Sequence, residues 1–542
     1  MLYPKCTITP LTYGELVLLF LLLSNISSAA SLDRIDVGGV WGTPGATNPT
    51  AIWWNPARLA RTPGTQILLE GAPIFATISH ERYNPDYGTI DPEHAVDIDG
   101  DGIPDLEYDY SGTDEITFNG VVPFVGISSD LGIPGFGIGA GLYAPFAIGG
   151  KTSKDMGPAR FALRDGNIQA VYTTLAAGYS PVDWLSFGIS GSHVMSTWHV
   201  DVDTESYTAL ADELATNESA ALLGGGQGVI PESYQDGYME APGYSLNLLF
   251  DPLQTQTFTF GGGFDIVPNN QWAVSMAYHQ GIRLEHSGGV EMRFRCPPDG
   301  DGASTLGAAF VGLCTIPDGE DERVGAVAQA RSRINYNLPG RLQGGVVWTP
   351  DPALRIEAMG GYVFWHVFTD YEIHTKVTDG DKYFDALLDG GAAETAELVS
   401  QDRLWARDSQ DAFWVGIDGK GEVAPWMTLA GRLMVDSPAV PTEALSANNI
   451  DAWTIAGTLA LIAHPTHAST KKTRLDVGLS YTRSQWLTRE NTESVFGLTV
   501  DPEQRKANRY FYPESNGTYG GNINRFGLSV RTTFGPAPTT GA

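Results

Sequence analysis

The chain has 542 residues and a formal net charge of −30 at pH 7, and this acidity excludes nucleic acid as a partner. Only 18% of residues are charged, 64 are Gly and 11% are aromatic, yet the mean hydropathy is −0.12. Beyond the N-terminus no apolar run approaches the roughly 20 residues of a membrane helix. Short alternating segments rich in Gly and aromatic residues instead indicate a membrane β-barrel.

Residues 1–30 are expected to be a signal peptide that is removed on export. Lys5 supplies a positive charge, and Leu16–Leu23 forms an apolar segment too short to span a bilayer. Small residues at positions 28–30 offer a cleavage site. The chain is therefore predicted to act outside the cytoplasm.

Three further segments follow the signal peptide. Ser31–Thr65 is rich in Gly, Pro, Asn and Trp and precedes the first convincing strand, so it is predicted to lie outside the barrel wall. Residues 66–534 carry the strands of the barrel. Gly535–Ala542, after the last aromatic residue, is expected to be a flexible tail.

The acidic stretch from Asp86 to Glu115 contains eleven Asp or Glu residues and no Lys or Arg. Within it, Asp97, Asp99, Asp101 and Asp105 surround Gly102 with the spacing of the first half of a calcium-binding loop. The bidentate Glu of a full loop is absent, because its position holds Tyr108. The two interpretations are a structural Ca²⁺ site in an extracellular loop and a solvated acidic run. No other cofactor is expected.

A second acidic stretch, the third long connection, contains many apolar side chains. Leu222, Leu223, Ile230 and Tyr234 are candidate contacts for a hydrophobic ligand. Leu246–Phe250 is expected to belong to the same connection. The alternative is a small helical core that closes over the mouth of the barrel.

One cysteine pair, Cys296 and Cys314, remains after removal of the signal peptide. An even number of cysteines in an exported chain predicts one disulfide bond, with two free thiols as the alternative.

Period-two alternation defines the predicted strands. Near the C-terminus, Phe526, Leu528 and Val530 share one face, whereas Arg525 and Ser529 share the other. A bulky apolar face opposite a charged face is typical of lipid outside and a wet lumen inside. A water-soluble β-sandwich is the less favoured alternative.

Connections between the strands alternate between short and long. Short turns are predicted at Leu131–Gly135, Ser180–Trp184, Val267–Gln271, Thr349–Ala353, Gly421–Pro425 and Pro465–Lys471. Long connections are predicted near His80–Glu115, Gly150–Asp165, Val202–Thr255, Ser287–Arg323, Glu372–Gln410, Asp436–Asp451 and Trp486–Gly520. Six turns and seven loops join fourteen strands, so the predicted fold class is all-β: a fourteen-stranded antiparallel transmembrane β-barrel with long extracellular loops.

Arginines on the polar faces are predicted to point into the lumen. They are Arg331, Arg333, Arg432, Arg474, Arg525 and Arg531. A guanidinium can bind a carboxylate through two hydrogen bonds, so Arg331, Arg333 and Arg432 are candidate ligands for a fatty acid head group. The alternative, which we favour for any single arginine, is pairing with lumen acids such as Asp436 and Asp476.

Catalytic motifs are weak, and the chain is not expected to be an enzyme. The segment from Gly188 to Ser192 lacks the final Gly of a nucleophile elbow. The ten His residues show no metal-binding spacing. An outer-membrane hydrolase is therefore disfavoured.

The N-terminal segment Asn55-Pro56-Ala57, with Trp53-Trp54 before it, resembles the NPA segment of FadL/TodX-type outer membrane transporters. Further similar segments follow in the family's order over nearly the whole mature chain. They are Pro123–Gly126, Gly137–Pro145, Gly157–Arg160, Tyr179–Gly188, Asn337–Pro339, Trp365 and Asp436–Pro441.

This resemblance implies a fourteen-stranded barrel in the bacterial outer membrane, closed by an N-terminal plug that includes Asn55, Pro56 and Ala57. It further implies a monomer that passively transports long-chain fatty acids or similar hydrophobic compounds, which leave laterally into membrane lipid. The alternatives are uptake of aromatic or alkane hydrocarbons, and a non-transporting, calcium-stabilised surface barrel used for adhesion.

Overall fold

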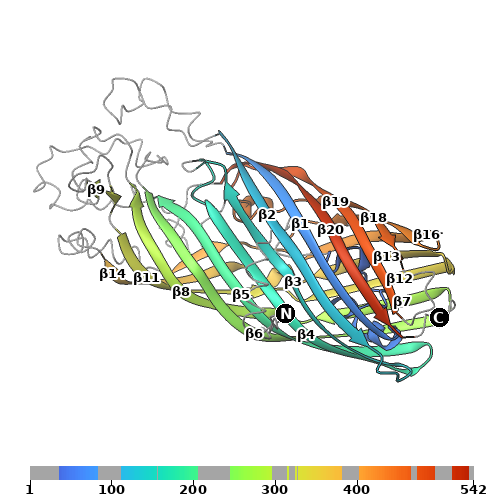
Figure 1. Ribbon diagram of the computed structural model, residues 1–542. Helices are drawn as coiled ribbons and strands as arrows, with labels where there is room; N and C mark the ends of the chain where they lie inside the picture. Colours follow the sequence, from blue (N-terminus) through green and yellow to red (C-terminus); the bar gives the residue numbers. More distant parts are fainter. Residues whose placement is uncertain are drawn as a thin grey trace, which may run out of the picture.

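The computed structural model describes residues 36–82, 112–154, 157–205, 245–295, 314–315, 324–325, 327–380, 402–465, 473–494 and 515–535. Nearly all of these residues belong to one antiparallel sheet that closes on itself, because β1 pairs with both β2 and β20. The result is a long tilted barrel (Figure 1).

Ten strands of the barrel are continuous. They are β1 (Thr65–Arg82), β2 (Gly112–Ser129), β3 (Phe136–Thr152), β4 (Asp165–Val182), β5 (Leu185–Glu205), β6 (Ser245–Asn269), β17 (Met427–Asp436), β18 (Thr454–Ala463), β19 (Thr473–Asn491) and β20 (Gly517–Phe534). The remaining barrel strands are each interrupted once and so consist of two segments.

These two-part strands are β7 (Trp272–His279) with β8 (Ile282–Arg295), β11 (Val327–Leu338) with β12 (Arg341–Asp351), β13 (Leu354–Val363) with β14 (Asp370–Gly380), and β15 (Arg403–Ala406) with β16 (Ala412–Ala424). Counted over the described residues, the wall therefore has fourteen strands, as the alternating turns predicted. A separate pair, β9 (Cys314–Thr315) with β10 (Val324–Gly325), lies outside the wall.

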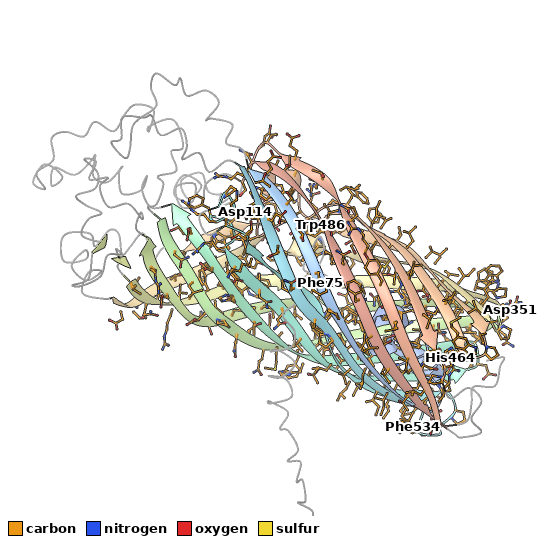
Figure 2. All side chains as sticks on the ribbon, turned by 45° about the horizontal axis from the view of Figure 1, so that its top comes forward. Phe75, Asp114, Asp351, His464, Trp486 and Phe534 are labelled. Atoms are coloured by element: carbon orange, nitrogen blue, oxygen red, sulfur yellow. The ribbon has the colours of Figure 1, made fainter. Side chains whose placement is uncertain are left out.

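The two ends of the barrel differ. Figure 2 shows Asp351, His464 and Phe534 at the end with the short turns, and Asp114 and Trp486 at the opposite end, where the long connections begin. In outer-membrane barrels the short turns are periplasmic and the long loops extracellular. We name the two ends accordingly.

The lipid-facing band is apolar, as the alternation predicted. Leu459, Leu175, Phe258 and Leu528 point outward with more than half of their surface exposed. Trp184, Trp272, Trp348, Trp426 and Phe534 form an aromatic girdle near the periplasmic turns. Aromatic girdles mark the borders of the hydrocarbon layer.

Several predicted loops were too long, because β8 and β14 continue to Arg295 and Gly380 and β6 begins early. Leu246–Phe250 belongs to β6, in a strand that begins ten residues before the predicted position near Thr255. Leu248 and Phe250 are buried inside the barrel. The barrel wall therefore extends further on the extracellular side than a bilayer requires, so its apolar side chains there face inward.

The N-terminal segment fills the barrel as a compact plug. It consists of η1 (Gly39–Trp41), α2 (Ala51–Trp54) and η2 (Pro56–Arg61). Two more short helices, η7 (Trp365–Val367) and η8 (Thr442–Ala444), lie beside the wall strands. None of the helices in the described ranges is long and apolar enough to cross a membrane.

Candidate functional site

Asn55, Pro56 and Ala57 lie inside the barrel and are buried. The Asn55 side chain caps η2 by accepting a hydrogen bond from the Ala57 amide at 3.1 Å, and Pro56 occupies the first position of the helix. The Asn55 amide donates to the carbonyl of Phe264 in β6 at 2.9 Å. The same side chain therefore shapes the plug and attaches it to the wall.

The strands β5 and β6 carry glycine where they contact this segment. A Cβ at Gly188 would collide with the backbone of Pro56 and Ala57, and one at Gly263 would collide with the Asn55 side chain. The close approach of two backbones therefore explains glycines that the sequence alone left without a role.

A buried carboxylate holds the plug to β6. Asp265 is fully buried and forms ion pairs with Arg58 at 2.8 Å and Arg61 at 3.0 Å, both from η2. Its second oxygen accepts a hydrogen bond from Ser275 at 2.7 Å. Arg58 also donates to the carbonyl of Gly45 at 2.8 Å, so it links two parts of the plug.

Arg432 points into the lumen, as predicted, but its guanidinium is used by the fold. It pairs with Asp418 at 3.1 Å and donates to the plug carbonyls of Gly39 and Gly42 at 3.2 and 2.8 Å. Arg525 likewise pairs with Asp36 of the plug at 3.2 Å. These contacts favour the interpretation that lumen arginines pair with protein groups.

Arg331 and Arg333 were predicted to face the lumen, and this was wrong. Both side chains are exposed on the outer face of β11, whereas Ile334 and Tyr336 are buried inside. Above the hydrocarbon layer the outer face meets water and the lumen is apolar, so the polarity of the two faces is reversed there. Neither arginine can reach a ligand in the lumen.

Replacing both arginines, as Arg331→Gln with Arg333→Gln, is expected to leave uptake of a hydrophobic substrate within about twofold of the unmodified protein. Exposed residues without buried partners contribute little to stability. Uptake by whole cells, normalised to the amount of folded barrel, measures this. A tenfold loss would contradict the outward placement.

Aromatic side chains fill the extracellular half of the lumen. Trp198 packs against Phe250 with ring centroids 5.0 Å apart and against Trp405 at 6.1 Å. Tyr371 packs against Tyr336 at 4.9 Å. All five side chains are at most 3% exposed.

A second aromatic group surrounds the plug at Trp53. Its ring contacts Tyr143 at 5.6 Å, Tyr172 at 6.1 Å and His279 at 4.3 Å. Both groups belong to one continuous cluster of buried hydrophobic residues. An aromatic interior therefore runs from the extracellular half of the lumen to the plug.

A buried guanidinium lies in the lower group. Arg341 is 1% exposed, with its Cζ atom 5.2 Å from the Trp53 ring and 5.8 Å from the Phe146 ring. It also interacts electrostatically with Asp436. Arg341 was not among the predicted lumen arginines, because it follows Pro339-Gly340, where the alternation restarts.

The wall is incomplete beside this group. Thr117 of β2 pairs with Lys151 of β3, and Phe124 pairs with Tyr143, but the residues between these pairs have no partner across the two strands. The strand β3 is also irregular against β4 between Tyr143 and Phe146. Ala144-Pro145 therefore opens the β2–β3 ladder where the aromatic interior meets the wall.

The connection between β17 and β18 folds over the extracellular mouth. Asp451 is buried there and accepts hydrogen bonds from the amides of Ala439 and Val440, the latter at 3.0 Å. Burial, together with the charge of Asp436, raises the pKa of Asp451 well above its usual range.

A hydrogen-bonded chain at the periplasmic end has the order hydroxyl, imidazole, carboxylate. The hydroxyl of Thr428 lies 2.9 Å from His464 Nε2, and His464 Nδ1 lies 2.7 Å from Asp476. Asp476 also forms ion pairs with Arg474 at 2.8 Å and with Arg531 at 2.7 Å. Two guanidiniums neutralise this carboxylate, so we interpret the network as a structural tie between the last strands.

Several predicted sites lie outside the described residues. They are the calcium-loop residues Asp97, Asp99, Asp101 and Asp105, the loop residues Leu222, Leu223, Ile230 and Tyr234, and Cys296. Cys314 lies in β9. Within the described ranges, no group of three His, Cys, Asp or Glu residues is arranged to hold a metal ion.

A family model described as "Outer membrane protein transport protein (OMPP1/FadL/TodX)" matches residues 42–405. None of the curated proteins matches the chain significantly.

Solved structures with the same fold are similar over their whole length. A FadL homologue of Pseudomonas aeruginosa is 17% identical, with a TM-score of 0.60, and the match covers 94% of this chain and 98% of that one. The toluene transporter TodX of P. putida is 12% identical, with a TM-score of 0.56 and coverages of 94% and 99%. The Ralstonia pickettii toluene transporter TbuX is 13% identical, with a TM-score of 0.53, and the match covers 93% of this chain and 98% of that one.

Proposed function

Because the chain belongs to the OMPP1/FadL/TodX family of bacterial outer membrane transport proteins for hydrophobic compounds, we propose that its substrates are long-chain fatty acids or similar amphipathic acids. These molecules enter from the extracellular side and leave laterally into the membrane. The protein acts as a monomer and needs no cofactor for transport.

The observation that carries this proposal is Arg341 within the aromatic interior. An apolar chain is favoured among Trp53, Phe146 and the aromatic group above them, and a carboxylate is favoured beside a buried guanidinium. A saturated hydrocarbon gains nothing from the charge, and an aromatic ring gains only a cation–π contact, which is weaker than a charge-assisted hydrogen bond to a carboxylate. The combination therefore supports an acid with an apolar tail over a neutral hydrocarbon.

Lateral exit at the β2–β3 gap is supported by the position of the gap. On the inner side Phe124 and Tyr143 stack at 5.9 Å, and on the outer side Val125 and Leu175 face lipid. A substrate that leaves here passes from one apolar environment to another without crossing water. The gradient of the substrate drives transport, with about 0.8 kcal/mol of transfer free energy for each CH₂ group that enters lipid.

Uptake of aromatic hydrocarbons is the second candidate function. The edge-to-face and tilted rings around Trp53 and Trp198 could contact a small aromatic molecule directly. The structural relatives TodX and TbuX are described as toluene transporters. A barrel used only for adhesion would need no continuous apolar interior, so we favour either kind of transport over it.

The test measures uptake of radiolabelled oleate and of toluene by cells that lack their own transporter and express this chain. Arg341→Met is expected to reduce oleate uptake about tenfold, the loss of one charge-assisted interaction, while toluene uptake is unchanged. Arg341→Lys retains the charge, so an intermediate rate of oleate uptake is expected. Arg333→Gln is the matched control, because its side chain is exposed on the outer face.

Wild-type uptake of toluene without oleate would select the second candidate. Equal oleate uptake by the wild type and Arg341→Met would remove the head-group role. A heat-modifiability gel confirms that each variant forms a folded barrel.

A further inference from the structure

The lipid-facing wall across β16–β20 is hollowed, although a wall in contact with lipid needs no recess. Two adjoining hollows of about 580 and 700 Å³ lie on either side of Leu459 and Tyr481, which are paired across β18 and β19 and line both. Leu433, Leu479 and Leu528 contribute apolar sides. The two hollows therefore form one apolar groove.

The first hollow owes its depth to missing side chains. A Cβ at Gly457 would meet no atom within 4 Å, and one at Gly431 would meet only the Thr458 carbonyl at 3.8 Å. No close contact therefore requires glycine at either position. Larger outward residues would fit and would fill the groove, as they do elsewhere in the band.

A single arginine stands at the extracellular end of the groove. Arg483 lies two residues beyond Tyr481 on the same face of β19, directly opposite Gly457 of β18. Its guanidinium donates to Asn524 at 3.0 Å and to Asn522 and Gln485 at 3.3 Å. All three acceptors are neutral amides, and no carboxylate of the described part of the chain forms an ion pair with Arg483.

Arg483 lies at the border of the hydrocarbon layer, where lipid head groups begin. An outward Arg is strongly destabilising at the bilayer midplane but nearly neutral near the interface. The next outward residues beyond Arg483 on β19 and β20 are the polar Gln485 and Asn522. On its other side, Tyr481, Phe526 and Phe75 form an aromatic cluster. Figure 2 shows Phe75 on the outer wall between the two ends of the barrel.

We propose that this wall binds one phosphate-bearing lipid of the outer leaflet, with the phosphate on Arg483 and an acyl chain in the groove along Gly457 and Leu459. The uncompensated positive charge complements an anion, and the apolar groove below it complements a hydrocarbon chain. The arrangement selects an amphiphile with both features. This site is separate from the lumen and from the transported substrate.

The test is native mass spectrometry of the full-length barrel in a non-ionic detergent, titrated with palmitoyl-oleoyl phosphatidylglycerol. Diacylglycerol with the same chains is the comparison lipid. Arg483→Gln is expected to weaken phosphatidylglycerol binding about fivefold, the effect of one basic residue at a lipid surface, and Arg483→Lys to retain most of it. Gly457→Leu fills the groove and is expected to cause a similar loss.

Two matched controls separate the site from general surface effects. Arg333→Gln removes an outward arginine outside the groove. Gly421→Leu adds a side chain at an equally open glycine that does not line either hollow. Both should bind like the wild type. Unchanged binding in Arg483→Gln and Gly457→Leu, equal binding of diacylglycerol, or occupation of the groove by a second copy of the chain would overturn the proposal.

Discussion

Deletion of Pro145 is expected to reduce substrate uptake at least tenfold while leaving the barrel and plug folded. Between their flanking pairs with β2, Tyr143 and Lys151 are eight positions apart, whereas Thr117 and Phe124 are seven apart. The strand β3 therefore carries one residue more than β2 can pair. Removing one residue allows the ladder to close across the proposed exit.

The strand β4 supports the same choice of residue. Tyr143 and Phe146 are three positions apart, but their partners Tyr172 and Ala170 are only two apart. One deletion at Pro145 therefore restores the register with both neighbours at once, and it removes the residue that has no backbone N–H to donate. The side chains of Phe146 and the residues after it keep their faces.

Pro145→Ala is the matched control, because it retains the extra residue and hence the gap. We expect it to transport at nearly the wild-type rate. Oleate uptake by cells and oleate binding by the purified barrel are measured together. Loss of uptake with retained binding supports lateral exit, and wild-type uptake by the deletion variant would contradict it.

The strand number could be predicted because it depends on local patterns. Turns such as Leu131–Gly135 and Ser180–Trp184 punctuate the chain regularly, and outward residues such as Leu528 alternate with inward ones such as Ser529. Such signals need no knowledge of distant parts of the chain.

The orientation of Arg331 and Arg333 could not be predicted in this way. Alternation reports that two faces differ but not which face is inside, and the assignment assumed lipid along the whole strand. The wall at β11 rises beyond the hydrocarbon layer, where Tyr336 belongs inside and arginine outside. The interruption at Pro339-Gly340 marks the change and is visible in the sequence only in hindsight.

The contacts between the plug and the wall also could not be predicted from the sequence. Asn55 stood out by its motif, but its acceptor at Phe264 is 209 residues away. Asp265 lies on the polar face of β6, and nothing in the local sequence distinguishes it from other lumen acids. Its role follows only from the fold, which brings Arg58 and Arg61 to it.

Replacing Asp265 with Ala is expected to release the plug from the wall. The substitution leaves Arg58, which is 7% exposed, without its buried carboxylate, and such a loss costs roughly 3–5 kcal/mol. The barrel itself is held by the backbone hydrogen bonds of fourteen strands, so the substitution destabilises the plug and not the barrel. Conductance in planar bilayers should rise, and trypsin should cleave after Arg58 and Arg61.

The double variant Asp265→Ala with Arg58→Ala tests the cause. If the penalty arises from an uncompensated buried charge, removing the guanidinium as well should restore part of the resistance to trypsin at Arg61, because the two effects are not additive. Asp351→Ala changes an aspartate at an exposed periplasmic turn and should leave both measurements unchanged. Full protection of the plug in Asp265→Ala would show that the glycine-lined seat and Asn55 suffice to hold it.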